Sequence, residues 1–162
     1  GVRIPTLREV FEEFPEVAMS VELKSEDSEL VAEVVALVQE FDRVDSTLLA
    51  SFSERIVKEI REELPDVATA AVQNEVVPFI VLNYIFVPGV YSPPSQALFV
   101  PLQSGPFEIP TGRFISNASR RNLFVAAWTI NDPGTIETLI DRDIDGLVTN
   151  RPDLVFEALG MY

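Results

Sequence analysis

Residues 123–130, LFVAAWTI, form a nearly continuous apolar run. Such a run is typical of a strand that is buried on both faces, as in the middle of a parallel sheet. The segments on either side have the composition and spacing of helices, and a further short apolar strand follows. The predicted elements are a helix over 111–121, a helix over 134–142, a strand over 146–149 and a helix over 152–159. This part of the chain therefore predicts an α/β fold.

The N-terminal half repeats the same alternation of strands and helices. Apolar side chains recur at helical spacing after Thr6, and Thr6 and Glu9 have the spacing of a capping box. The remaining predicted strands are 17–24, 44–52, 67–72 and 97–102, and the other helices are 25–41 and 53–64. Strands that alternate with helices at this spacing predict a parallel sheet made of right-handed βαβ units.

About six strand–helix units are present, and two architectures remain open. One is a (β/α)8 barrel of the TIM type that is incomplete here, because a full barrel has eight strands and about 250 residues. The other is a doubly wound open sheet. No glycine-rich fingerprint follows any strand, so dinucleotide binding has no support. The length of 162 residues predicts a single domain over 1–162.

Residues 73–96 interrupt the alternation. They are rich in proline and large apolar residues without a clear period, and they are predicted to form an irregular apolar insertion. The apolar stretch is shorter than the roughly 20 residues of a membrane span. The favoured interpretation buries the insertion in the barrel, and the alternative rests residues 76–94 on a lipid surface. Residues 1–7 do not resemble a signal peptide, and the compartment stays unknown.

The composition excludes several classes of site. Histidine and cysteine are absent, so the chain holds no histidine base, no Ser-His-Asp triad and no thiolate ligand or nucleophile. A net charge of −14 disfavours nucleic acid as a partner, because the phosphate backbone is repelled. The acidity is interpreted first as solubility and second as an attraction for divalent cations.

Catalytic side chains of a barrel lie at the C-terminal ends of its strands. The strand over 17–24 ends with Glu22 and Lys24, which are two residues apart and therefore face the same side. They are candidates for a cation ligand and a contact to an anionic substrate oxygen, or else form an ordinary surface ion pair. Trp128, near the end of the strand over 123–130, is a candidate wall of a substrate pocket or a core residue.

Five ordered motifs resemble the glycerophosphodiester phosphodiesterase family. They are GVRIPTL at 1–7, VELK at 21–24, SF at 51–52, WTINDP at 128–133 and DGLVTNRPD at 145–153. The resemblance implies a TIM-type barrel and hydrolysis of a glycerophosphodiester, or of a lysophospholipid-like substrate, to glycerol 3-phosphate and an alcohol. It also implies that Glu22 is a ligand of a divalent cation, Mg²⁺ or Ca²⁺, that Lys24 binds near the phosphate, and that Trp128 lines the mouth of the site.

The departures from the family pattern concern the acid–base groups. The family's catalytic histidines lie on its first two strands, ahead of the segment that begins here at Gly1. The chain is therefore expected to be the C-terminal portion of the domain, with no catalytic residue of its own and no activity alone. A non-catalytic binding or scaffold protein is the alternative. Exposed sheet edges are expected to favour self-association.

Smaller departures occur at single positions. Asn150 stands in place of the family's aspartate, and Ser119 in place of a helix histidine. Asn122 and Asp143 replace glycines at helix ends, which is physically reasonable because asparagine and aspartate adopt the left-handed conformation more readily than most residues.

Overall fold

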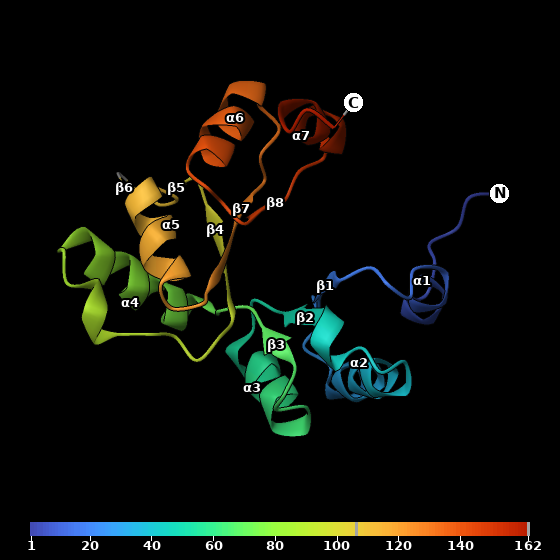
Figure 1. The fold of residues 1–162 in the computed structure, drawn as a ribbon. Coiled ribbons are helices and arrows are strands. Elements are labelled where there is room, and N and C mark those ends of the chain that lie inside the picture. Colours follow the sequence, from blue (N-terminus) through green and yellow to red (C-terminus); the bar gives the residue numbers. More distant parts are fainter. Residues whose placement is uncertain (106, 162) are drawn as a thin grey trace. The chain divides into compact units, whose positions relative to one another are not determined.

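The computed structural model describes residues 1–105 and 107–161. The chain divides into two compact units: unit 1 is Gly1–Gln73, and unit 2 begins at Asn74. Figure 1 shows the elements of both units along the chain. Parallel strand–helix units occur in each, so the predicted α/β fold is confirmed.

Unit 1 contains a three-stranded parallel sheet in the order β1-β2-β3. Thr6 and Glu9 form the predicted capping box at the start of its first helix. Its elements are α1 (Leu7–Glu13), β1 (Met19–Glu22), α2 (Ser28–Glu40), η1 (Val44–Ser46), β2 (Thr47–Ala50), α3 (Glu54–Glu63) and β3 (Ala68–Thr69). The three strands correspond to three of the six predicted from the sequence.

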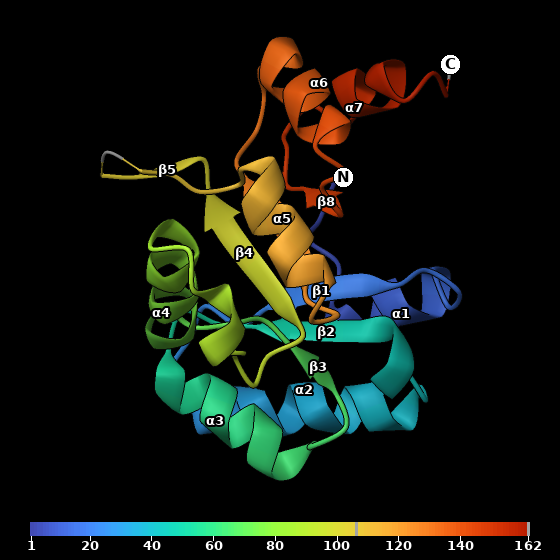
Figure 2. The same ribbon diagram turned by 60° about the vertical axis from the view of Figure 1, so that its left-hand side comes forward.

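The core of unit 1 lies between this sheet and the apolar faces of its helices. Helices α2 and α3 lie side by side along the sheet (Figure 2). Their valines and isoleucines recur every three or four residues, so one face of each helix is apolar and becomes buried. Fully buried members of this core are Phe11, Val31, Val38, Leu49, Ile56 and Ile60.

Unit 2 contains a second three-stranded parallel sheet in the order β4-β7-β8, and an antiparallel hairpin of β5 with β6. Its elements are α4 (Gln73–Tyr84), η2 (Pro88–Val90), β4 (Ala97–Pro101), β5 (Gln103–Ser104), β6 (Phe107–Glu108), α5 (Gly112–Ser119), β7 (Phe124–Trp128), α6 (Pro133–Asp141), β8 (Gly146–Leu147) and α7 (Pro152–Ala158). Three consecutive residues of β7, Val125, Ala126 and Ala127, are buried, so this strand is covered on both faces as predicted.

The prediction that residues 73–96 are irregular is wrong for the first half of that segment. Helix α4 occupies Gln73–Tyr84, and the 3-10 turn η2 follows at Pro88–Val90. Two features concealed the helix. Its apolar side chains are spread around the axis rather than along one stripe, and Pro78 lies inside it, where a proline lacks the N–H that a helix uses.

Asn122 and Asp143 adopt the left-handed conformation expected of them, with φ of 54° and 58°. Each closes a helix by hydrogen bonds back into its last turn. After α5, the N–H of Asn122 donates to Ser119 O at 2.9 Å and the N–H of Leu123 to Ala118 O at 3.1 Å. This is the bond pattern of a Schellman motif, in which glycine is the usual residue at positive φ.

Replacing Asn122 with glycine is expected to raise the free energy of unfolding by about 0.5 kcal/mol, because glycine has no Cβ to penalise positive φ. Asn122→Ala is expected to lower it by about 1 kcal/mol, since alanine retains the Cβ and lacks the polar group that makes asparagine tolerant. Urea unfolding of the two variants measures both values. Equal stability of the glycine and alanine variants would contradict the argument.

Candidate functional site

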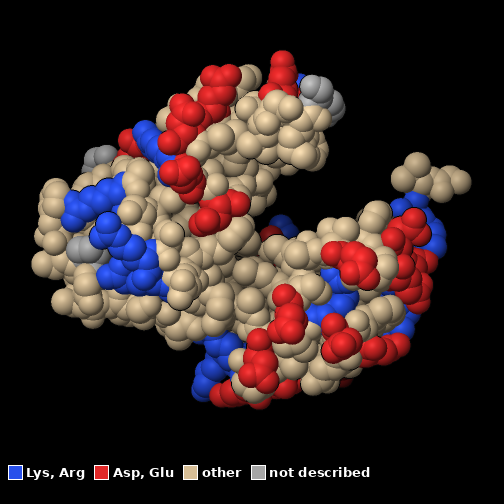
Figure 3. All heavy atoms as spheres, in the orientation of Figure 1, with Lys and Arg blue, Asp and Glu red and all other residues tan. Residues whose placement is uncertain are grey.

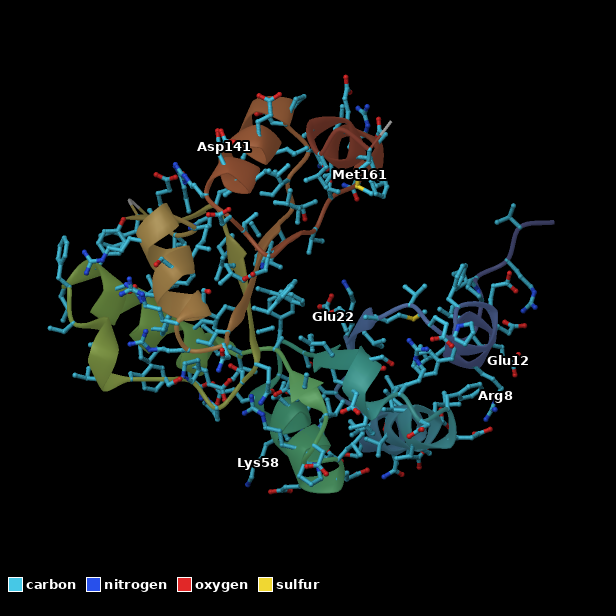
Figure 4. The ribbon with its side chains drawn as sticks, in the orientation of Figure 1. Arg8, Glu12, Glu22, Lys58, Asp141 and Met161 are labelled. Atoms are coloured by element: carbon cyan, nitrogen blue, oxygen red, sulfur yellow. The ribbon has the colours of Figure 1, made fainter. Side chains whose placement is uncertain are left out.

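The C-terminal end of β1 brings together two of the three predicted site residues. Glu22 is the last residue of β1 and is in register with Ala50 of β2. Its Oε2 lies 3.4 Å from the Nζ of Lys24, and the side chains of Glu22 and Lys24 are 35% and 81% exposed. Figure 4 shows the side chain of Glu22 at the end of β1. A carboxylate and an ammonium are thus presented to solvent at the end of a parallel strand.

Ser51 holds the backbone between these two side chains. Its hydroxyl donates to the carbonyl oxygen of Leu23 at 2.7 Å and accepts from the N–H of Ser53 at 3.2 Å. The N–H of Leu23 donates to Ala50 O at 2.7 Å. Both backbone groups of Leu23 are therefore bonded to the end of β2, which fixes where Glu22 and Lys24 emerge. The Ser-Phe motif predicted a strand end but not this role of the serine.

The Glu22–Lys24 contact is weak as a source of stability. Exposed pairs of this kind contribute between 0 and about 1 kcal/mol, because both charges remain hydrated. Either partner is therefore available to another ligand at little cost. Among the described residues, no group of three or more acidic side chains is placed to hold a metal ion. Glu22 can offer one carboxylate to a hard cation and is not a complete site.

Trp128, the third predicted site residue, belongs to unit 2. It is the last residue of β7, lies opposite Pro101 at the end of β4, and is half-buried. The peptide bond that follows it, Trp128–Thr129, is cis. The indole therefore stands at the C-terminal edge of the unit 2 sheet, where a barrel presents its pocket walls.

Asn131 joins the two turns that follow β7 and β8. Its Oδ1 accepts from the hydroxyl of Thr149 at 3.1 Å and from the N–H of Asn150 at 2.9 Å. Sequence reasoning placed Asn131 in a motif without assigning this bond. A polar side chain directly after the apolar run 123–130 was the available signal, because such a residue often bonds a neighbouring turn.

Asp132 begins helix α6 as its N-cap. Its Oδ2 accepts from the N–H of Thr135 at 2.9 Å and from the Thr135 hydroxyl at 2.8 Å. These two bonds, the backbone one first, hold the pKa of Asp132 below its usual value. The carboxylate therefore stays ionised and anchors the turn that begins at Trp128.

Asp145, just before β8, and Gly146, its first residue, serve packing. Asp145 Oδ2 accepts from the N–H of Val125 at 2.8 Å, which ties the entry of β8 to the start of β7. A Cβ on Gly146 would lie 2.8 Å from Cζ of Phe124 and 3.3 Å from Cβ of Ala126. Only glycine allows this approach without displacement of its neighbours, so the motif residues Asp145 and Gly146 set the spacing of the β7–β8 pair.

Four of the five motifs now have defined places at strands β1, β2, β7 and β8, and a comparison with known proteins agrees with the resemblance that they carry. The model of the Glycerophosphoryl diester phosphodiesterase family matches residues 1–154. The chain belongs to this family. Among its relatives, lysophospholipase D GDPD1 of Mus musculus is 31% identical, with 99% of this chain and 58% of the relative covered. The probable glycerophosphodiester phosphodiesterase 2 of Mycobacterium tuberculosis is 23% identical, with 98% and 61% covered.

Solved structures of family members have the same fold. A putative glycerophosphodiester phosphodiesterase from Galdieria sulphuraria superposes with a TM-score of 0.73 at 16% identity, covering 96% of this chain and 64% of that one. A phosphodiesterase from Oleispira antarctica, solved in complex with the product sn-glycerol-3-phosphate, gives a TM-score of 0.69 at 20% identity and covers 96% and 61%. The predicted (β/α)8 type, incomplete in this chain, is thereby confirmed.

The chain spans 54–63% of the length of three curated relatives that it matches. Within residues 1–105 and 107–161, no helix is long and apolar enough to cross a membrane.

Proposed function

We propose that this chain contributes to the hydrolysis of glycerophosphodiesters to glycerol 3-phosphate and an alcohol, with lysophospholipid-like molecules among the substrates. The observation that supports this most directly is the Glu22–Lys24 pair, 3.4 Å apart at the end of β1, in a chain whose family match spans residues 1–154. The Oleispira antarctica phosphodiesterase was solved with sn-glycerol-3-phosphate, and the murine relative is a lysophospholipase D.

The three candidate side chains have separate roles in this proposal. Lys24 contacts a phosphate oxygen, for which an exposed ammonium with three donors is suited. Trp128 forms an apolar wall for the organic part of the substrate. Glu22 supplies one ligand to a divalent cation, Mg²⁺ or Ca²⁺, which would stabilise the charge that develops on the phosphate.

The donor set of this chain fits such a cation only in part. Carboxylate oxygen is what Mg²⁺ and Ca²⁺ prefer, and the chain has no histidine or cysteine that would favour a softer metal. Calcium takes roughly six to eight oxygen ligands, however, and Glu22 offers one carboxylate. The cation would require further ligands beyond Glu22.

Proton transfer is the part of the reaction that this chain does not supply. The family resemblance assigns acid–base catalysis to histidines, and the chain has none. The 162-residue chain alone is therefore expected to release no glycerol 3-phosphate from glycerophosphocholine, with or without Mg²⁺ or Ca²⁺, because it lacks the histidines to which the resemblance assigns proton transfer to the leaving oxygen. An enzyme-coupled assay for glycerol 3-phosphate measures this.

Binding of the product tests the site independently of turnover. Lys24→Gln is expected to weaken binding of glycerol 3-phosphate about tenfold or more, as loss of one charge-assisted hydrogen bond predicts. Lys58→Gln is the matched control, because Lys58 is 78% exposed on α3 and pairs with Glu62 much as Lys24 pairs with Glu22. Isothermal titration calorimetry measures the affinity of each variant for glycerol 3-phosphate. Equal affinities of Lys24→Gln and Lys58→Gln would refute the role of Lys24.

A non-catalytic binding or scaffold protein is the second candidate. It is favoured by the absence of histidine and by Asn150 in place of an aspartate. Metal-dependent phosphodiesterase activity of this chain would exclude it, whereas product binding without turnover suits both candidates.

We also propose that the two units belong to one barrel domain and that free sheet edges favour self-association. In such an incomplete barrel the free edges would be those of its first strand, β1, and its last strand, β8. Unpaired N–H and C=O groups along such edges can pair with another chain. Light scattering over a range of protein concentrations measures the association, and a monomer at every concentration would contradict it.

A further inference from the structure

We propose that the end of helix α4 and the helix α5 beside it form a docking surface for an anionic phospholipid bilayer. The surface has an apolar part and a basic part, both within unit 2. This inference goes beyond the proposed phosphodiesterase function and does not depend on Glu22 or Lys24.

The apolar part is a group of exposed large side chains on α4 and in the turn after it, here called the α4 patch. Its members are Val77, Val81, Ile85, Phe86, Val87 and Val90, which are between 44% and 76% exposed. Val77, Val81 and Ile85 are four residues apart, so they share one face of the helix. Contiguous exposed apolar residues on a soluble domain indicate a surface that meets another apolar phase.

Phe86 is the most exposed member of the patch, at 76%, and it has a backbone that its side chain disfavours. Its φ is +66°, whereas the other non-glycine residues with positive φ in the described part of the chain are Asp42, Asn122 and Asp143. The N–H of Val87 donates to Leu82 O at 3.0 Å, so Phe86 occupies the position that glycine usually takes at a helix end. A bulky residue held in such a conformation points to a role other than stability.

The basic part consists of arginines on α5 and at its end. The guanidinium of Arg113 lies 3.7 Å from the centroid of the Phe86 ring, and both side chains border a cavity of about 230 Å³. Arg113 and Arg120 are exposed and seven residues apart, so they lie on the same face of α5. An apolar ring beside a guanidinium matches the boundary between acyl chains and phosphate headgroups.

The charge of this region is opposite in sign to that of the whole chain. Residues 74–122 contain three arginines and two glutamates, a net charge of +1, whereas the full chain carries −14. Figure 3 shows a group of blue side chains over the region of α4 and α5, whereas most of the red side chains in that view lie over other parts of the chain. An acidic protein is repelled by an anionic bilayer overall, so this locally basic face selects the orientation in which it can approach.

The end of α4, next to the patch, contacts the hairpin that follows β4. Tyr84, the last residue of α4, stacks on Phe107 with ring centroids 4.4 Å apart and donates its hydroxyl to Glu108 O at 3.4 Å. Phe107 and Glu108 form β6 of the hairpin that follows β4. The bilayer would therefore meet the same edge of the sheet that carries Trp128, which suits a substrate drawn from a membrane.

Co-sedimentation of the full 162-residue chain with vesicles tests the proposal. The chain is expected to bind vesicles that contain phosphatidylserine together with phosphatidylcholine. Binding is expected to be weaker at high salt and with vesicles of phosphatidylcholine alone. Phe86→Asp is expected to weaken partitioning about tenfold or more, and Arg113→Glu about fivefold. The matched controls, Leu159→Asp for an exposed apolar residue and Lys58→Glu for an exposed cation, are expected to leave partitioning unchanged.

Phe86→Gly separates a lipid contact from a structural role. Glycine is expected to maintain or raise the melting temperature, because it relieves the positive φ, while vesicle binding falls as with Phe86→Asp. A lower melting temperature with unchanged vesicle binding would overturn the proposal. Equal binding to vesicles of pure phosphatidylcholine would also overturn the proposal. A third contrary result would be a chain that binds no vesicles but forms a dimer, with Phe86→Asp converting that dimer to a monomer.

Discussion

Replacing Arg43 with methionine is expected to lower the free energy of unfolding by about 3 kcal/mol, because it removes a buried, charge-assisted hydrogen-bond centre. Arg43 is 2% exposed. Its guanidinium donates to the carbonyl oxygens of Phe14, at 3.3 Å, and of Pro15 and Val17. The same group lies 4.8 Å from the ring centroid of Phe11. Methionine fills a similar volume but removes the guanidinium donor from three carbonyl oxygens, of which that of Phe14 keeps a bond from the N–H of Val17 at 3.3 Å.

Urea unfolding of Arg43→Met and Arg43→Lys measures this contribution. Lysine retains the charge but not the planar fork, so it is expected to recover only part of the loss. Arg55→Met is the matched control, since Arg55 is 51% exposed and pairs with Glu59 on the surface of α3. A loss for Arg43→Met no greater than that of the control would show that the three carbonyl bonds contribute little. Because Val17 precedes β1, the same variant is expected to loosen the strand that ends at Glu22.

Replacing Phe79 with alanine is expected to lower the free energy of unfolding by about 4 kcal/mol, the usual cost of deleting a buried phenyl ring and leaving a cavity. Phe79 is fully buried on α4. Its ring meets that of Phe114 edge to face at 5.3 Å between centroids, and the guanidinium of Arg121 lies 5.8 Å from it. The ring therefore holds α4 against α5.

Thermal unfolding with Phe107→Ala as control isolates this effect. Phe107 is 44% exposed and stacks on Tyr84, so its loss is expected to cost about 1 kcal/mol or less. Phe79→Leu, which retains most of the volume, is expected to recover part of the stability. Equal losses for Phe79→Ala and Phe107→Ala would show that α4 does not depend on Phe79.

The parallel strands were predictable because their sequences agree with their environment. LFVAAWTI at 123–130 is apolar throughout, and in the structure consecutive residues of β7 are buried on both faces. The ends of several helices were predictable in the same way, from the residue types at those ends. Thr6 with Glu9 forms the expected capping box, and Asn122 and Asp143 adopt positive φ at the predicted positions. Local propensity and burial indicate the same element in each case.

Elements that depend on distant contacts escaped prediction. Helix α4 has no apolar stripe and contains Pro78, and the β5–β6 hairpin has only two residues in each strand. Neither leaves a periodic pattern in the sequence. Arg43 was missed because the carbonyl groups that it binds lie 26 to 29 residues away in the chain. Strand ends identified Glu22, Lys24 and Trp128, but nothing in the spacing gave the bonds of Ser51 or Asn131.

The double acceptor at Asn131 has a consequence for how this part of the molecule can change in evolution. Asn131 Oδ1, in the turn after β7, accepts two hydrogen bonds from the turn after β8, at 3.1 Å and 2.9 Å. Neither turn can lengthen alone without breaking these two bonds. Insertions and deletions are therefore expected to be rare in the turns after β7 and β8. The β5–β6 hairpin after β4 has exposed strands, and surface loops tolerate changes of length. Diversity among descendants of this chain would accumulate in the hairpin, and the two coupled turns would remain constant in length.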